Sequence, residues 1–206
     1  MTVVAAALAL GLVAPRALAG NVHSTPDNGK EHVHKLHNPL PKKHKATVGL
    51  TRDQKFMDKH PGGREPPAHS FSKHEQKVHE LHVHNGLLHK KDPVTGHLTP
   101  YDTGGSQARF VMKPSGRIIA DHRLHTETGA PIVHPSLSRH KRVAAAGMMK
   151  VDQGRLTEIN NSTGHFQATP HHHTQVVHEL RCRGVRAFRS VTGDYPGGSR
   201  QSTNVD

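Results

Sequence analysis

The chain has 206 residues, a formal net charge of +12 and 33% hydrophobic residues. That hydrophobic fraction is below the about 45–50% usual for globular proteins, and the length excludes two large domains. The single cysteine, Cys182, excludes an intramolecular disulfide and zinc sites of the CxxC type. The positive charge favours acidic partners, but it does not choose among nucleic acid, anionic membrane and acidic protein surfaces.

The first 19 residues have the pattern of a secretory signal peptide. Residues 3–14 are an apolar run, and Ala17-Leu18-Ala19 before Gly20 fits a small-x-small cleavage site. The run is too short to span a membrane, which takes about 20 residues. We therefore expect residues 1–19 to be a signal peptide, no transmembrane segment, and a secreted or periplasmic protein.

Residues 20–69 are rich in His, Pro and Lys and poor in large apolar residues. Such a segment buries too little surface to offset the entropy lost on ordering. It is expected to be a low-complexity basic arm that is disordered. Apolar residues recur regularly only after it, so residues 70–195 are predicted to form the folded domain. The polar residues 196–206 are predicted to be a disordered tail.

Three β-hairpins are predicted within the domain. Residues 81–84 alternate in polarity and lead into Asn85-Gly86, the strongest two-residue hairpin signal. Two further pairs join residues 109–112 to 118–119 and residues 143–151 to 156–159 through turns that contain glycine. Residues 188–191 are predicted to be a last strand.

Helix signals flank these hairpins. Ser72 and Glu75 form a capping-box pattern that predicts a short helical turn. Thr169 as N-cap and Pro170 at the first position predict a longer helix, which Gly184 ends. The expected fold class is α+β: antiparallel hairpins form a sheet, and one late helix packs on it.

An ordered series of short motifs resembles a known family. The series is, in chain order, His134-Pro135-Ser136-Leu137, Val143-Ala144-Ala145-Ala146-Gly147, Gly154-x-Leu156, Ser162-Thr163-Gly164-His165-Phe166 and Ala168-Thr169. It resembles the region after the IQ motif in plant IQ-motif-containing calmodulin-binding proteins and their uncharacterised fungal and bacterial relatives. The strand pair within residues 75–90 is similar to the family's upstream pair. The resemblance covers roughly residues 70–192.

The sequence also departs from that family. Pro135 replaces the usual Ser after the histidine, and Phe166 stands where Tyr is usual. No IQ motif is found in the sequence, and the family's calmodulin binding resides in that motif. The resemblance therefore implies a fold for this chain but no calmodulin binding.

His134, Ser136 and His165 are the candidate catalytic residues. A His near a Ser can act as base and nucleophile, provided that an acid and an oxyanion site complete the arrangement. Gly164 and His165 are candidate ligand-binding residues, because glycine lets backbone approach a ligand closely. The alternative is that both histidines hydrogen-bond backbone groups where strands end.

Glu80, His82 and His84 alternate along one predicted strand, which places three metal-ligand types on one face. The alternative is a solvated strand face. No cofactor is predicted, although histidine runs such as residues 171–173 can hold a divalent metal adventitiously.

The basic clusters at residues 42–45 and 139–142 lack interleaved aromatic residues, so they do not indicate specific nucleic-acid recognition. The leading hypothesis is a secreted, non-catalytic protein-interaction module with an acidic partner, an effector acting on a host protein. The alternatives are an enzyme of unknown reaction with its site around His134, Ser136 and His165, and a secreted metal-binding protein.

The signal-peptide hypothesis predicts cleavage after Ala19 on export, because the small-x-small site directly precedes Gly20. N-terminal sequencing of the exported protein should begin at Gly20. An exported protein that still begins with Met1 would contradict the hypothesis.

Overall fold

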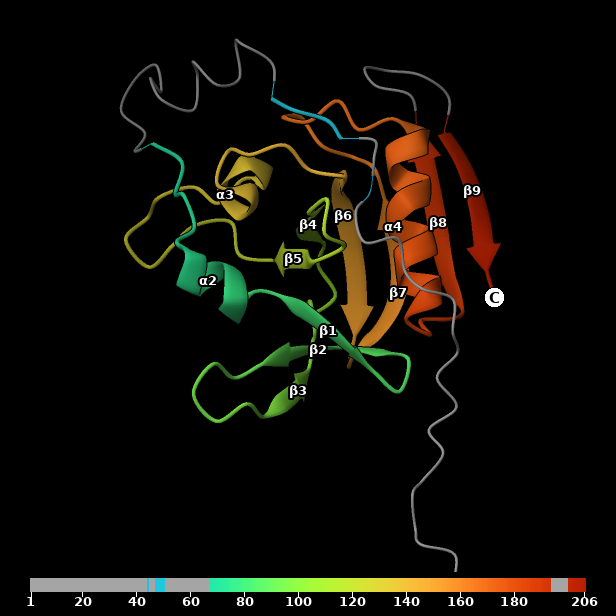
Figure 1. Ribbon diagram of the computed structural model, residues 1–206, viewed down its shortest axis with the longest axis horizontal. Coiled ribbons are helices and arrows are strands. Elements are labelled where there is room, and N and C mark those ends of the chain that lie inside the picture. Colours follow the sequence, from blue (N-terminus) through green and yellow to red (C-terminus); the bar gives the residue numbers. More distant parts are fainter. Residues whose placement is uncertain (1–43, 45–46, 51–66, 194–199) are drawn as a thin grey trace, which may run out of the picture. The chain divides into compact units, whose positions relative to one another are not determined.

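A computed structural model describes residues 44, 47–50, 67–193 and 200–206 (Figure 1). The predicted signal peptide and most of the predicted basic arm lie outside these residues. The helices are α2 (Lys73–Val78), α3 (His134–Ser138) and α4 (Pro170–Cys182). The strands are β1 (Leu81–His84), β2 (Leu87–Lys91), β3 (Leu98–Pro100), β4 (Ala108–Met112), β5 (Ile118–Asp121), β6 (Ala145–Asp152), β7 (Arg155–Asn160), β8 (Phe188–Gly193) and β9 (Arg200–Val205).

These strands form two sheets, one of three strands in the order β1-β2-β3 and one of six in the order β5-β4-β6-β7-β8-β9. The predicted α+β class is confirmed, and so are the three hairpins. The sheet was expected to be antiparallel throughout, but β7 and β8 run parallel. Helix α4 connects these two strands and returns the chain to the same end of the sheet. The short strand β3 and the short helix α3 were not predicted.

The larger sheet is buried on both faces at its centre. Phe110 and Met112 of β4 pack in one cluster with Val176 and Leu180 of α4 and Leu88 of β2. The residue between them points the other way, as the two-residue period of a strand requires. That residue, Val111, packs in a second cluster whose other members include Leu137 of α3, Leu50 and Phe166. Helix α4 and the small sheet thus cover one face, and α3 with residues 48–50 covers the other.

Local chemistry sets the ends of α4. Thr169 precedes its first residue in extended conformation, its backbone N–H donates to His172 Nδ1 at 3.2 Å, and its Oγ1 lies 2.8 Å from the same nitrogen. At the other end Gly184 has φ +92°, a value that residues with side chains rarely adopt. The N–H of Val185 then reaches back to the Leu180 carbonyl at 3.0 Å. The helix therefore begins and ends where the sequence predicted.

The predicted basic arm, residues 20–69, is corrected at its described C-terminal part. Val48 and Leu50 form isolated bridges with Val143 and Phe166, and Leu50 is buried. His44 is buried too, and its Nε2 lies 3.0 Å from Glu179 Oε2 on α4. These residues are part of the domain. Val48 and Leu50 alternate with polar or small residues, so both apolar side chains can pack on the same face of the core.

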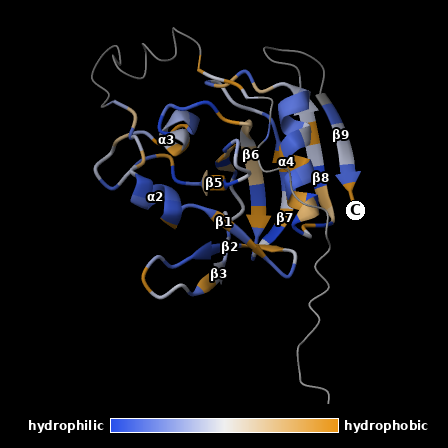
Figure 2. Cartoon of the chain, in the orientation of Figure 1, coloured by the Kyte–Doolittle hydropathy of each residue, from blue (hydrophilic) through white to orange (hydrophobic). Residues whose placement is uncertain are grey.

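The predicted disordered tail, residues 196–206, is also corrected. Residues 200–205 form β9, which pairs antiparallel with all of β8, and Val205 is buried in the first cluster. Figure 2 shows β9 as hydrophilic except at its C-terminal end. Backbone pairing to β8 and one buried valine order this polar segment, and neither is visible in its composition.

The packing around Gly147, the third residue of β6, is tight, and a substitution there can test it. A Cβ atom added there would lie 1.8 Å from the Asn160 carbonyl oxygen, whereas one added at Gly164 would meet nothing within 4 Å. We expect Gly147→Ala to lower the free energy of unfolding by about 3 kcal/mol or more, because the clash is with backbone. Gly164→Ala, the matched control, should change it by about 0.5 kcal/mol at most. Urea unfolding measures both, and equal effects would contradict the described packing.

Candidate functional site

His134 is the first residue of α3, and its ring is buried against β6. Its Nε2 lies 2.9 Å from the Gly147 carbonyl oxygen. A carbonyl oxygen only accepts, so Nε2 carries the proton and donates. Burial is the main cause that lowers the pKa of His134 to about 4, and the nearby charges of Arg109 and His165 lower it further. His134 is therefore neutral at neutral pH and joins α3 to β6.

Ser136 is fully buried, and its hydroxyl accepts a hydrogen bond from the backbone N–H of Val133 at 3.0 Å. This bond closes the first turn of α3 in the manner of a helix cap. Ser136 does not line the cavity that contains His134. The structure thus does not bring together the predicted nucleophile and base.

His134 and His165 do line one open cavity of about 390 Å³. Its walls come from β4 and the residue before it, from α3 and from the loop between β7 and α4. The loop is organised by Thr163, whose hydroxyl accepts from the backbone N–H groups of His165 and Phe166 at 3.4 and 3.3 Å. Gly164, the other predicted ligand-binding residue, is exposed at the cavity.

The predicted metal ligands Glu80, His82 and His84 have other surroundings. Both carboxylate oxygens of Glu80 accept from Arg117 Nε at 2.9 Å, and Arg117 Nη2 makes a further contact. The His84 ring lies 5.8 Å from the ring of His89, centroid to centroid. Among the described residues, no three His, Cys, Asp or Glu side chains converge to hold a metal ion.

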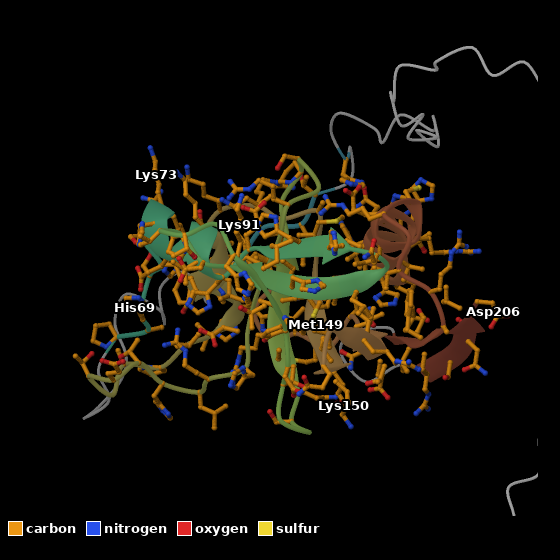
Figure 3. The ribbon with its side chains drawn as sticks, turned by 90° about the horizontal axis from the view of Figure 1, so that it is seen from below. His69, Lys73, Lys91, Met149, Lys150 and Asp206 are labelled. Carbon is orange, nitrogen blue, oxygen red and sulfur yellow. The ribbon has the colours of Figure 1, made fainter. Side chains whose placement is uncertain are left out.

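A second cavity, of about 520 Å³, lies where the small sheet meets β5, and no sequence pattern singled it out. Figure 3 shows the small sheet, with Lys91 labelled on β2. The walls are mainly apolar, and nine ionisable side chains from four separate segments line it. They are His79, Lys90, Lys91, Asp92, Tyr101, Asp102, Asp121, His122 and Arg123.

Lys90 links the two sheets beside this cavity. Its Nζ donates to the carbonyl oxygens of His79 and Ala120, each at 2.6 Å, and lies 4.7 Å from the centre of the Tyr101 ring. Burial lowers the pKa of Lys90 to about 7, although the charge of Asp121 opposes the shift. A lysine with such a pKa, in a cavity and beside an acid, is typical of functional sites.

Asp121 is buried, and Arg123 holds its carboxylate with Nε at 3.1–3.2 Å and Nη2 at 2.8 Å. Burial by itself would raise the pKa of Asp121, but the hydrogen bonds from Arg123 outweigh burial and the pKa falls. Arg123 Nη2 also lies 3.0 Å from His79 Nε2, which must accept. Burial, then the charge of Lys90, lowers the pKa of His79 to about 4.

Tyr101 is 5% exposed, and among the described residues no hydrogen-bond partner lies within reach of its hydroxyl. Burial raises the pKa of Tyr101, so the hydroxyl remains a donor. A buried donor without a partner costs about 1–3 kcal/mol. Such groups are rare in native proteins, and a water molecule or a bound ligand can supply the missing partner.

A signal for this site exists in the sequence. Lys90 follows Leu88 by two residues on one strand, so a buried Leu88 places Lys90 on the core side. The register pairs Lys90 with Leu81, also buried, which a hairpin built on Asn85-Gly86 requires. A lysine on the apolar face of a predicted hairpin was therefore the sequence signal for a buried lysine at this site.

A histidine–serine pair occurs elsewhere, between α4 and β8. His173 Nε2 lies 2.8 Å from Ser190 Oγ, and both residues are buried. Burial lowers the pKa of His173 to about 4, which makes it a weak base at neutral pH. No hydrogen-bond partner for His173 Nδ1 is found in the described part of the chain, so no acid orients this ring. The pair is suited to joining α4 and β8.

The low pKa values of His79, His134 and His173 predict loss of stability in mild acid. Each is about 4 in the folded chain against 6.5 for a free histidine, so the unfolded chain binds more protons between these values. Stability is thus full above pH 6.5 and falls as the pH approaches 4. Each histidine contributes on the order of 3 kcal/mol at most. Urea unfolding at several pH values measures the slope.

His134→Gln should flatten this dependence, because glutamine donates to the Gly147 carbonyl without titrating. His171→Gln, at an exposed position of α4, is the matched control and should change the slope less than His134→Gln does. Equal slopes for both variants would show that His134 is not held neutral.

No protein-family model, no curated protein and no solved structure matches the chain. The resemblance to the calmodulin-binding family therefore stays a prediction. Among the described residues, no helix has both the length and the apolar character needed to cross a membrane.

Proposed function

We propose that the chain is an exported, non-catalytic protein-interaction module whose partner presents an acidic segment to the cavity around Tyr101. The unpartnered Tyr101 hydroxyl carries this proposal. A carboxylate is the strongest acceptor that a protein partner offers to such a donor. Binding would then supply a hydrogen bond for which the described residues offer no partner, and because the hydroxyl is itself buried, Tyr101 must shift toward the cavity to form it.

The cavity that Tyr101 lines has cationic and apolar side chains in its walls, beside the carboxylates of Asp92, Asp102 and Asp121. Lys90 lies against the ring of Tyr101, and the exposed Lys91 and Arg123 stand at the cavity. Pro93 and Pro100 add apolar wall for the neighbouring side chains of the segment. Buried tyrosine and arginine residues in such settings dominate the binding energy of many protein interfaces.

The net charge of the whole chain also favours an acidic partner. The formal net charge of +12 attracts acidic surfaces and speeds their association. Close to the cavity the charges balance, because Asp121 and Arg123 neutralise each other and Asp92 and Asp102 stand beside Lys90 and Lys91, so the attraction is long-range. An effector role toward a host protein is consistent with such a basic surface on an exported chain.

The buried histidines are poorly suited to acid–base catalysis at neutral pH. A general acid or base works best with a pKa near the operating pH. Burial instead lowers the pKa of His79, His134 and His173 to about 4. The hydroxyl of Ser136, the predicted nucleophile, is occupied by the turn of α3.

The test uses labelled peptides that place Glu or Asp among apolar residues, beside peptides with Gln or Asn at the same positions. We expect the full chain to bind the acidic peptides at least tenfold more tightly, measured by fluorescence polarisation. Tyr101→Phe should weaken that binding about tenfold or more, since a hydrogen bond to a charged group contributes about 1.5–3 kcal/mol. The same variant should unfold at an equal or higher urea concentration, because it removes a buried donor that has no partner.

Arg123→Gln should also weaken binding, whereas Arg186→Gln, the same change at an exposed position outside the cavity, should not. Tyr101→Phe that is destabilised yet binds normally would contradict the proposal. Equal losses in the two arginine variants would show that only net charge matters.

A further inference from the structure

The cavity shared by His134 and His165 carries donors and no carboxylate. Arg109 and Gln107 reach it from β4 and the residue before that strand. Ser162 and Thr163 belong to the loop on the other side, and no Asp or Glu is among the lining residues. Such a lining suits a ligand that accepts hydrogen bonds and carries negative charge.

Arg109 is the central cation of this cavity. Its guanidinium is half-buried, and its Nη1 donates to the Arg123 carbonyl oxygen at 3.2 Å. That bond fixes the planar fork and uses one of its five N–H groups. The nearest acid across the sheet, Asp121, pairs in register with Arg109 but is bound through both oxygens by Arg123. Asp121 acts on Arg109 through its charge, but among the described residues no hydrogen bond joins the two side chains.

Arg109 and His165 line this cavity together with His134. Burial is the main cause that lowers the pKa of His134, the hydrogen bond to the Gly147 carbonyl opposes the shift, and the charges of Arg109 and His165 lower the pKa further. Two basic side chains from different segments therefore converge on one cavity. The neutral His134 ring forms part of the wall between them.

We infer that this cavity binds a phosphate group, either inorganic phosphate or a phosphate monoester. The donors stand on two separate sides, β4 and the 162–165 loop, which suits an acceptor with several oxygens. Arginine binds phosphate through two parallel N–H groups. The cavity volume of about 390 Å³ leaves room for the organic part of a monoester. This site is separate from the Tyr101 cavity and does not rest on the function proposed for it.

The loop leaves the site open. Gly164 is exposed, and a Cβ atom added there would meet nothing within 4 Å. A ligand can thus approach the backbone of this segment closely. Phe166, two residues further, is fully buried and forms a bridge with Leu50, so the loop is anchored beside its open part.

The experiment titrates the ¹⁵N-labelled full chain with inorganic phosphate at constant ionic strength, with chloride as the reference anion. We expect saturable shifts of the Thr163, Gly164 and His165 amide signals, with a dissociation constant on the order of 1 mM. Arg109→Gln and His165→Gln should each weaken binding at least tenfold. Arg155→Gln, the same charge change at an exposed position of β7, should bind as the unmodified chain does.

A second titration uses phenyl phosphate. Tighter binding than inorganic phosphate by tenfold or more identifies a monoester as the ligand class, and equal binding identifies free phosphate. Shifts that do not saturate, or a folded Arg109→Gln variant that binds normally, would overturn the inference. If Arg109→Gln is destabilised, Arg109→Lys takes its place in the test. Because lysine keeps the charge, this variant should bind phosphate more tightly than Arg109→Gln but more weakly than the unmodified chain.

Discussion

The burial of β4 on both faces is the constraint on which the remaining structure depends. Phe110 and Met112 need a cover on one side of the sheet, and Val111 needs one on the other. Leaving either face in water would cost about 1.5–3 kcal/mol for each large side chain. Helix α4 and the small sheet supply one cover, and α3 with residues 48–50 supplies the other. Both cavities lie where separate covering segments meet the strands of this sheet.

The contact between the small sheet and the larger one depends on a charged group. Lys90 Nζ binds two carbonyl oxygens, of His79 before β1 and of Ala120 on β5, and so closes the junction. Burying an ammonium is costly, and these carbonyls, the Tyr101 ring and Asp121 offset part of that cost. The residues that join the sheets are therefore the ones that line the Tyr101 cavity. If a partner binds there as proposed, side chains already held by the junction would lose less entropy on binding.

Features set by neighbouring residues were predictable, and features set by distant ones were not. Asn85-Gly86 and Gly184 specify a turn and a helix end through their own backbone preferences, and the structure confirms both. Strand β9 has no such signal, since its polar residues are ordered by pairing with β8. Residues 48–50 read as part of a basic arm until the open face formed by Val143 and Phe166 is known. Lys90 reads as a surface residue until the face of its strand is assigned.

The predicted His134–Ser136 pair shows how the backbone decides the meaning of a motif. In a strand, residues two apart share a face, so a base at 134 and a hydroxyl at 136 would point to the same side. In a helix they lie about 200° apart around the axis and do not meet. A residue that precedes proline, as His134 does, usually favours extended backbone. Pro135 instead occupies the first turn of α3, where a missing N–H costs nothing. His134 therefore turns toward Gly147 of β6, and Ser136 turns back to cap its own helix.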